Sequence, residues 1–441
     1  MPPIPIRSCA PAAARPGAGY TSAARAACRR SARSRTSVEQ VREITVLTRS
    51  SLQGASAAAA RDLEPGPARQ QPQWPDAALA RRVRGQLANL PGLLEVEEVL
   101  ALRTRLAAVA TGAAQVVQAG DCAEDPADCT PGDVARKSEL LELLAGRMEE
   151  NTGRPVLRVG RLAGQFAKPR SAQTERVGDL ELPAYRGYMV NGPEPDPECR
   201  RPDPTRILSG YRLAGAVMRY LGWADRGAHP RPAPEVWTSH EALLLDYELP
   251  MVRRSASGRA WLSSTHWPWI GERTRQVDGA HVALLAQVVN PVACKVGPTM
   301  TTGELLALCE RLDPRREPGR LTLITRMGAD EIGGRLPALV AAVRAAGHPV
   351  IWLCDPMHGN TLATPDGFKT RLLHRIVQEV TRFQDAVGNG GGLHLETTPD
   401  DVTECARTWA DVPHVGDKYT SLCDPRLNPD QALAVVSAWR A

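Results

Sequence analysis

Hydrophobic and polar positions follow two alternating patterns along most of this chain. Short apolar runs recur from residue 114 onward, and stretches with helical periodicity separate them. Repeated strand–helix units of about 30 residues are typical of a parallel sheet. The runs that we predict to be β-strands are 114–120, 154–161, 259–265, 292–298, 321–328, 349–356 and 392–398.

Amphipathic helices are predicted both before and between these strands. Residues 76–90 and 96–110 carry apolar residues at helical spacing and precede the first strand, which predicts a helical lead-in. Residues 303–312 and 335–347 have the same periodicity, and Gly347 is a typical C-terminal helix signal.

Polar residues stand at the ends of the predicted strands. An open doubly wound sheet gathers its ligands at one switch point, whereas a closed barrel gathers them from every strand. Because every run has such a residue, we predict an α/β fold of the (β/α)₈ barrel type. The residues are Cys122, Arg161, His266, Lys295, Arg326, His358 and Glu396.

Charge is distributed unevenly along the 441 residues. Residues 1–60 contain nine Arg and two Glu, so the rest of the chain carries 45 basic against 47 acidic residues. This balance does not favour nucleic-acid binding, and no apolar stretch reaches the roughly 20 residues that span a bilayer. We predict a disordered extension rich in Ala, Arg, Ser and Pro over residues 1–70 and a barrel domain over 71–441. A targeting segment or a mis-assigned start is the alternative for the extension.

The ten cysteines include no CxxC pair, and several lie in or beside apolar runs. This usage favours reduced thiols over a disulfide framework, and we therefore expect a cytoplasmic protein.

Four residues suggest a metal site: Cys122, His358, Glu396 and Asp424. Each of them alone is more often a buried thiol, a satisfied polar residue or a surface charge. Together, a thiolate, an imidazole and two carboxylates suit Mn²⁺, Fe²⁺, Co²⁺ or Zn²⁺ better than Mg²⁺ or Ca²⁺.

A group of cations accompanies these four residues and is often flanked by Gly or Pro. Guanidinium groups bind phosphate through two parallel hydrogen bonds, so the group predicts phosphorylated substrates. The chain lacks GxGxxG opening a helix, GxxxxGK[ST] and GxSxG, so neither a nucleotide site nor a serine nucleophile is indicated. The cations are Arg161, Lys168, Arg170, Arg273, Arg275, Lys295 and Arg326.

Several segments between residues 74 and 428 resemble, in order, the type II (plant-like) 3-deoxy-D-arabino-heptulosonate 7-phosphate (DAHP) synthases. They include DCAE, VGRLAGQFAKPRS, WIGERTRQVDGAHV, NPVACKVGPTM, LTLITRMGAD, CDPMHGNT and CDPRLN. The resemblance implies a metal-bearing (β/α)₈ barrel that condenses phosphoenolpyruvate with erythrose 4-phosphate, the first step of the shikimate pathway.

The resemblance also implies roles for individual residues. Cys122, His358, Glu396 and Asp424 become the metal ligands, with Mn²⁺ expected first and Co²⁺, Fe²⁺ or Zn²⁺ as alternatives. The expected ligands of phosphoenolpyruvate are Arg161, Glu272, Arg273, Lys295 and Arg326, and the expected ligands of the sugar phosphate are Lys168, Arg170 and Ser171. Lys295, Glu272 and Arg161 are the expected catalytic residues. The family also implies a homo-oligomer and a chorismate mutase partner.

The chain departs from the family pattern between Gly222 and Glu235, where relatives carry several dozen more residues. We therefore expect the third strand to be abbreviated to 235–237 or missing, and we expect no regulation by aromatic amino acids. Such a shortened form indicates a role in secondary metabolism. Two alternatives stay open, namely an amino-substituted tetrose phosphate as substrate and a non-catalytic homologue that acts as a binding or regulatory partner.

Overall fold

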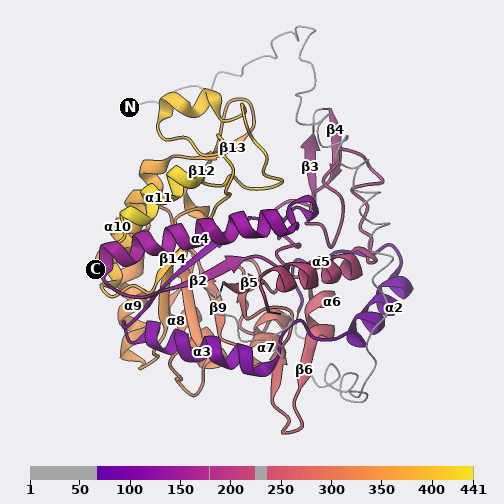
Figure 1. Ribbon diagram of the computed structural model, residues 1–441, viewed down its shortest axis with the longest axis horizontal. Helices are drawn as coiled ribbons and strands as arrows, with labels where there is room; N and C mark the ends of the chain where they lie inside the picture. Colours follow the sequence, from indigo (N-terminus) through magenta and orange to yellow (C-terminus); the bar gives the residue numbers. More distant parts are fainter. Residues whose placement is uncertain (1–66, 178, 224–235, 441) are drawn as a thin grey trace, which may run out of the picture. The chain divides into compact units, whose positions relative to one another are not determined.

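A computed structural model describes residues 67–177, 179–223 and 236–440 of the chain (Figure 1). These residues belong to a single compact unit. Nearly all of the predicted extension, residues 1–66, lies outside the described residues, as does most of the shortened segment 222–235. Among the described helices, none is long and apolar enough to cross a bilayer.

Eight parallel strands close into a barrel, which confirms the predicted fold class (Figure 1). Following the hydrogen bonds around it, the order is β1, β14, β11, β10, β9, β8, β5 and β2. Side chains of these strands are almost all buried, as expected where helices cover the outside of a parallel sheet. The strands are β1 (Gln115–Gly120), β2 (Val156–Arg161), β5 (Trp237–Glu241), β8 (Trp267–Ile270), β9 (Val292–Val296), β10 (Leu321–Thr325), β11 (Ile351–Cys354) and β14 (Gly392–Glu396).

The expectation of an abbreviated or missing third strand is wrong. The third barrel strand is the five-residue β5, and it pairs with β2 on one side and β8 on the other. Its sequence, WTSHE, has a polar middle that hides it from a search for apolar runs. Thr238 and Ser239 are hydrogen-bonded inside the barrel. Thr238 Oγ1 lies 2.8 Å from His266 Nδ1, and Ser239 Oγ donates to the carbonyl of Gly160 at 2.9 Å and accepts from Gln118 Nε2 at 2.9 Å.

The predicted strand at 259–265 is also not a barrel strand. Its core, β7 (Ala260–Leu262), pairs antiparallel with β6 (Val252–Arg254) in a separate two-stranded sheet. The fourth barrel strand is β8, whose WPWI sequence follows a few residues later. His266 therefore precedes a barrel strand instead of ending one. Its ring packs against Trp223 and Trp237, with ring centroids 4.1 and 5.0 Å away.

The helices confirm the predicted lead-in and the helices between strands. Gly347 follows α9 with a φ of 75°, which is the left-handed conformation that ends helices. The α-helices are α2 (Ala77–Ala88), α3 (Val96–Ala110), α4 (Pro131–Thr152), α5 (Arg206–Tyr220), α6 (Leu245–Glu248), α7 (Ala280–Gln287), α8 (Thr302–Leu312), α9 (Ile332–Ala345), α10 (Leu373–Val387) and α11 (Pro429–Ser437). The 3₁₀ turns are η2 (Pro126–Asp128), η3 (Leu249–Met251), η4 (His358–Asn360) and η5 (Trp409–His414).

Two further hairpins extend the loops that follow barrel strands. The hairpin of β3 (Thr174–Val177) and β4 (Leu180–Pro183) follows β2, and it projects from the barrel in Figure 1. The hairpin of β12 (Thr361–Ala363) and β13 (Lys369–Arg371) follows β11. Both therefore belong to the C-terminal end of the barrel, where active sites of this fold lie.

The start of β14 approaches β1 so closely that only glycine fits. Gly392 has a φ of 142°, and a Cβ atom there would lie 1.9 Å from the carbonyl oxygen of Val116. We expect Gly392→Ala to lower the free energy of unfolding by about 3 kcal/mol or more, because both the conformation and the space reject a side chain. Urea unfolding measures the change. Gly146→Ala is the matched control, since a Cβ atom there meets nothing within 4 Å and helix α4 favours alanine.

Candidate active site

Three of the four predicted metal ligands converge at the C-terminal end of the barrel. Cys122 follows β1, Glu396 ends β14, and Asp424 lies in the loop before α11. The Cys122 sulfur and one oxygen of each carboxylate all lie within 4.8 Å of one another. Cys122 and Glu396 are buried, so few of these donor atoms are solvated. This spacing fits a single divalent cation.

A lysine ammonium lies among these donors. Lys168 Nζ donates to Cys122 Sγ and to Asp424 Oδ2, the latter at 2.5 Å. Burial alone would lower the pKa of Lys168, but Asp424 and Cys122 raise it well above its usual value. A positive charge is therefore stabilised where the donors meet, which is what a cation site requires.

His358, the fourth predicted ligand, joins the group through Glu396. Its Nε2 lies 3.3 Å from Glu396 Oε1, while its Nδ1 lies 2.7 Å from Asp355 Oδ2. Metal-binding imidazoles commonly use one nitrogen for the metal and the other for a carboxylate. Asp355 is fully buried and is the natural partner for that second nitrogen.

Glu396 stays ionised although it is fully buried. Burial would raise its pKa, but His358 and Arg371 hold the pKa well below the usual range. Arg371 Nη2 lies 2.8 Å from one carboxylate oxygen, and Arg161 Nη2 donates to the other at 3.1 Å. The carboxylate is thus fixed in position by two guanidinium groups.

Lys295 has the properties of a proton donor near neutral pH. It lies in β9, and its Nζ donates to Asp355 Oδ2 at 2.5 Å. Burial lowers the pKa of Lys295 to about 8, although Asp355 acts in the opposite direction. The same aspartate therefore holds the lysine and the histidine of the site.

Arg161 is the last residue of β2 and contacts Glu396 in the site. Its Nε donates to the carbonyl of Asp121 at 3.0 Å, and its guanidinium carbon lies 5.2 Å from the ring centre of Trp269. Its Nη1 lies 2.5 Å from His394 Nε2. These contacts hold a cation that is 97% buried, since its relative exposure is 3%.

Two of the other predicted cations, Arg273 and Arg275, line a hollow of about 460 Å³ at the mouth of the barrel together with Glu272. Arg273 Nη2 donates to Ser171 Oγ at 2.6 Å, and Arg275 pairs with Glu272 at 2.8 Å.

Two further predicted cations lie outside that lining. Arg170 pairs with Glu175 of the β3–β4 hairpin. Arg326 Nε is buried and has no hydrogen-bond partner among the described residues, which suits it to an anionic ligand.

Sequence reasoning missed several residues of this site. Cys423 is hydrogen-bonded to Cys122 through their sulfur atoms, and burial raises the pKa of Cys122. Glu241 ends β5, and burial raises its pKa also. Asp355 directly follows a strand and could have been found by the rule that found His358. Arg371 gave no signal, because a fully buried arginine looks like a surface charge in a sequence.

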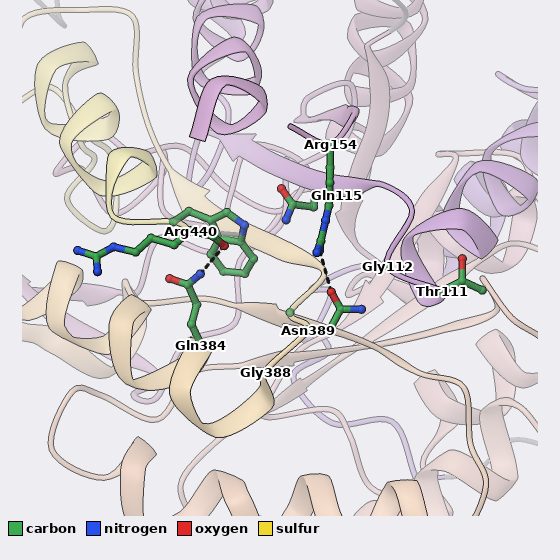
Figure 2. A pocket seen from close by; sticks show the side chains of 10 residues that line it. Thr111, Gly112, Gln115, Arg154, Gln384, Gly388, Asn389 and Arg440 are labelled. Carbon is green, nitrogen blue, oxygen red and sulfur yellow. Dashed lines mark hydrogen bonds between the residues drawn. The ribbon is translucent and has the colours of Figure 1, made fainter. Parts of the chain in front are cut away.

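A second pocket of about 350 Å³ lies at the opposite end of the barrel (Figure 2). Gln115, the first residue of β1, lines it together with Arg154 and Asn389, which are joined by a hydrogen bond of 2.9 Å. None of the predicted site residues lines this pocket. In this fold the N-terminal end usually serves stability, and the chemistry lies at the other end.

The chain is similar to several known proteins. The profile of the Class-II DAHP synthetase family matches residues 59–231 and 221–438. A probable phospho-2-dehydro-3-deoxyheptonate aldolase of Pseudomonas fluorescens is 57% identical over 377 residues, covering 84% of this chain and 94% of that protein. The phospho-2-dehydro-3-deoxyheptonate aldolase of Mycolicibacterium smegmatis is 39% identical over 425 residues, covering 83% and 90%. A solved phospho-2-dehydro-3-deoxyheptonate aldolase from Francisella tularensis gives a TM-score of 0.48 at 12% identity, covering 82% and 97%.

We expect the protein to bind Co²⁺ through Cys122, which produces a sulfur-to-cobalt charge-transfer absorption. Cys122→Ser should remove that absorption and weaken Co²⁺ binding on the order of 100-fold, because a hydroxyl is a much poorer ligand than a thiolate. Titration followed by absorbance and calorimetry measures both effects. Cys129→Ser, in a buried cysteine that bonds the carbonyl of Asp125 instead, is the control. An unchanged spectrum in Cys122→Ser would show that this sulfur is not a ligand.

Proposed function

The chain belongs to the class-II DAHP synthetase family, and we propose that the residues at the C-terminal end of its barrel perform the reaction of that family. The reaction condenses phosphoenolpyruvate with erythrose 4-phosphate and is the first step of the shikimate pathway. The observation that best supports the choice of residues is the convergence of Cys122, Glu396 and Asp424 within 4.8 Å beside a set of buried cations.

Phosphoenolpyruvate is assigned to the cations on the β2, β9 and β10 side. Arg326 has a buried guanidinium nitrogen with no partner among the described residues, so it can accept an anion without breaking an existing bond. Arg161 and Lys295 are both buried, and the positive charge of each lowers the pKa of His394, so the two cations lie close to the same imidazole. Arg273 and Glu272 complete the set at the rim, where Glu272 also holds Arg275.

The sugar phosphate is assigned to the KPRS segment that follows β2. Ser171 already accepts a hydrogen bond from Arg273, and Arg170 is held by Glu175. Lys168 contacts two of the predicted metal ligands, which supports a sugar subsite next to the proposed metal site. The two substrates therefore meet between Lys295 and Cys122.

When bound, a divalent cation supplies a Lewis acid that polarises the aldehyde oxygen of the tetrose. Cys122, His358, Glu396 and Asp424 are the proposed ligands, with Mn²⁺ first and Co²⁺, Fe²⁺ or Zn²⁺ as alternatives. Lys295 is the proposed proton donor to the aldehyde oxygen as the new carbon–carbon bond forms. A pKa of about 8 lets it hold a proton at neutral pH and still release it readily.

The biological setting is part of the proposal as well. We infer a cytoplasmic homo-oligomer with chorismate mutase as a partner, and a role in secondary metabolism. The support is the short segment between Gly222 and Glu235 and the family itself.

A non-catalytic role is the alternative from a different class. A missing third strand would support this role, but the barrel is closed. The full set of donors and cations also favours an active enzyme. Buried charges are costly, and a protein without catalytic activity would not need to keep them in this site. An amino-substituted tetrose phosphate stays open, since the KPRS segment binds the phosphate and not the far end of the sugar.

We expect the purified protein with Mn²⁺ to convert phosphoenolpyruvate, erythrose 4-phosphate and one water into a seven-carbon phosphate and inorganic phosphate. Mass spectrometry with a panel of four-carbon aldehyde phosphates identifies the product and the preferred tetrose. Arg326→Lys should lower kcat/KM on the order of 100-fold, because the charge stays but the two-pronged hydrogen bond is lost. Absence of product with every aldehyde would favour the non-catalytic role.

The pKa of Lys295 sets the alkaline limit of activity. Its ammonium form donates the proton, so kcat/KM should fall as the pH rises through about 8 and should be level just below it. Lys295→Arg, whose guanidinium does not titrate in this range, should be much less active and should lack this limb. Lys418→Arg, at an exposed lysine, should keep the wild-type profile. A limb that persists in Lys295→Arg would assign it to another group.

A further inference from the structure

Two loops of the proposed site touch each other through glycine. The loop after β10 carries Arg326 and continues to Gly328, and the η4 turn after β11 carries His358 and Gly359. A Cβ atom on Gly359 would lie 2.2 Å from the backbone nitrogen of Gly328, and one on Gly328 would lie 2.8 Å from the carbonyl oxygen of Gly359. The backbone carrying the proposed anion-binding arginine therefore lies directly against the backbone carrying a proposed metal ligand.

A single buried carboxylate on α10 joins the same two loops. One oxygen of Glu379 accepts the backbone N–H groups of Met327 at 3.0 Å and Gly328 at 2.9 Å. The other oxygen accepts from Asn360 Nδ2 at 2.6 Å. The carboxylate thus contacts the residues that follow Arg326 and the last residue of the turn that holds His358.

Asn360 extends this connection back to the first loop. Its Oδ1 accepts the backbone N–H of Ala329 at 3.1 Å, and its Nδ2 also donates to the carbonyl of Pro356 at 2.8 Å. Glu379 and Asn360 therefore form one hydrogen-bonded link that fixes both loops at once. Movement of either loop would leave buried donors unsatisfied, at a cost of about 1–3 kcal/mol for each group.

Helix packing alone does not explain a glutamate at this position. The buried face of α10 otherwise consists of Ile376, Val380, Phe383 and Val387, so an apolar residue would suit the helix better. Glu379 has no measurable exposure, and burial raises its pKa to about 7. A group that is so costly to bury needs a purpose that the helix itself does not supply.

We propose that Glu379 is a positioning residue that couples the two halves of the site, so that its loss weakens binding of the metal and binding of phosphoenolpyruvate together. The coupling rests on the proposed function, in that Arg326 binds the substrate anion and His358 binds the metal. Glu379 touches neither ligand itself and acts only through the two loops.

The test compares Glu379→Gln with wild type by two binding measurements that need no turnover. Co²⁺ affinity is measured by calorimetry, and phosphoenolpyruvate affinity is measured in metal-free protein by tryptophan fluorescence. Glutamine keeps an acceptor for Met327 and Gly328 but places an N–H₂ group against Asn360 Nδ2. We expect both dissociation constants to rise about 10-fold, the lower end of the loss that follows removal of a direct partner of a metal ligand, because Glu379 acts one step further away, through the loops. Asp385→Asn, the same change at an exposed carboxylate of α10, should leave both within twofold.

Asn360→Ala provides a second variant on the same link. It should weaken Co²⁺ binding. Adding Glu379→Gln to it should weaken Co²⁺ binding little further, because both changes break the same hydrogen bond between Glu379 and Asn360. Additive losses, or a Glu379→Gln protein that loses only one of the two affinities or neither, would overturn the coupling. If wild-type protein binds neither Co²⁺ nor phosphoenolpyruvate, the proposed function fails instead. Thermal unfolding of each variant verifies that the losses occur in folded protein.

Discussion

The pairing of buried charges at the C-terminal end of the barrel is the constraint on which this structure depends. Glu396 is fully buried between Arg161 and Arg371, Asp355 is buried against Lys295, and Asp121 is buried against Lys137 and Arg426. A buried charge is tolerated only when it is paired and hydrogen-bonded. The charged residues at the ends of different strands must therefore lie close enough to pair. A closed barrel of parallel strands brings them together, because all of its strands end on the same side.

Closure of the barrel depends in turn on a strand that contains little apolar sequence. β5 fills the gap between β2 and β8, and its Thr238 and Ser239 are satisfied by neighbours within the barrel. Without that strand, the edges of β2 and β8 would present unpaired N–H and C=O groups to each other.

The loops of the site are held by carboxylates more than by regular secondary structure. Glu124 accepts the backbone N–H groups of Ala163, Gly164 and Gln165, next to Arg161. Glu404 accepts those of Thr420, Ser421 and Arg426, on both sides of Asp424. Glu379 plays the same part between the other two loops. Fixed loops suit a site whose ligands must keep their distances while substrates enter.

The sequence determined the fold class and most of the candidate site, because apolar runs followed by a polar residue are a local pattern. Cys122, Lys295 and His358 were found in this way, and Glu396 ends its strand as predicted. The third and fourth barrel strands were predicted wrongly. The polar middle of β5 is stabilised only by partners distant in the sequence, and the apolar run of β7, just before β8, pairs with β6 outside the barrel. The buried carboxylates Glu124, Glu379 and Glu404 were likewise invisible, because a glutamate that binds backbone N–H groups of another loop looks like any surface glutamate. Only the tertiary structure supplies those partners, and burial without them would be too costly.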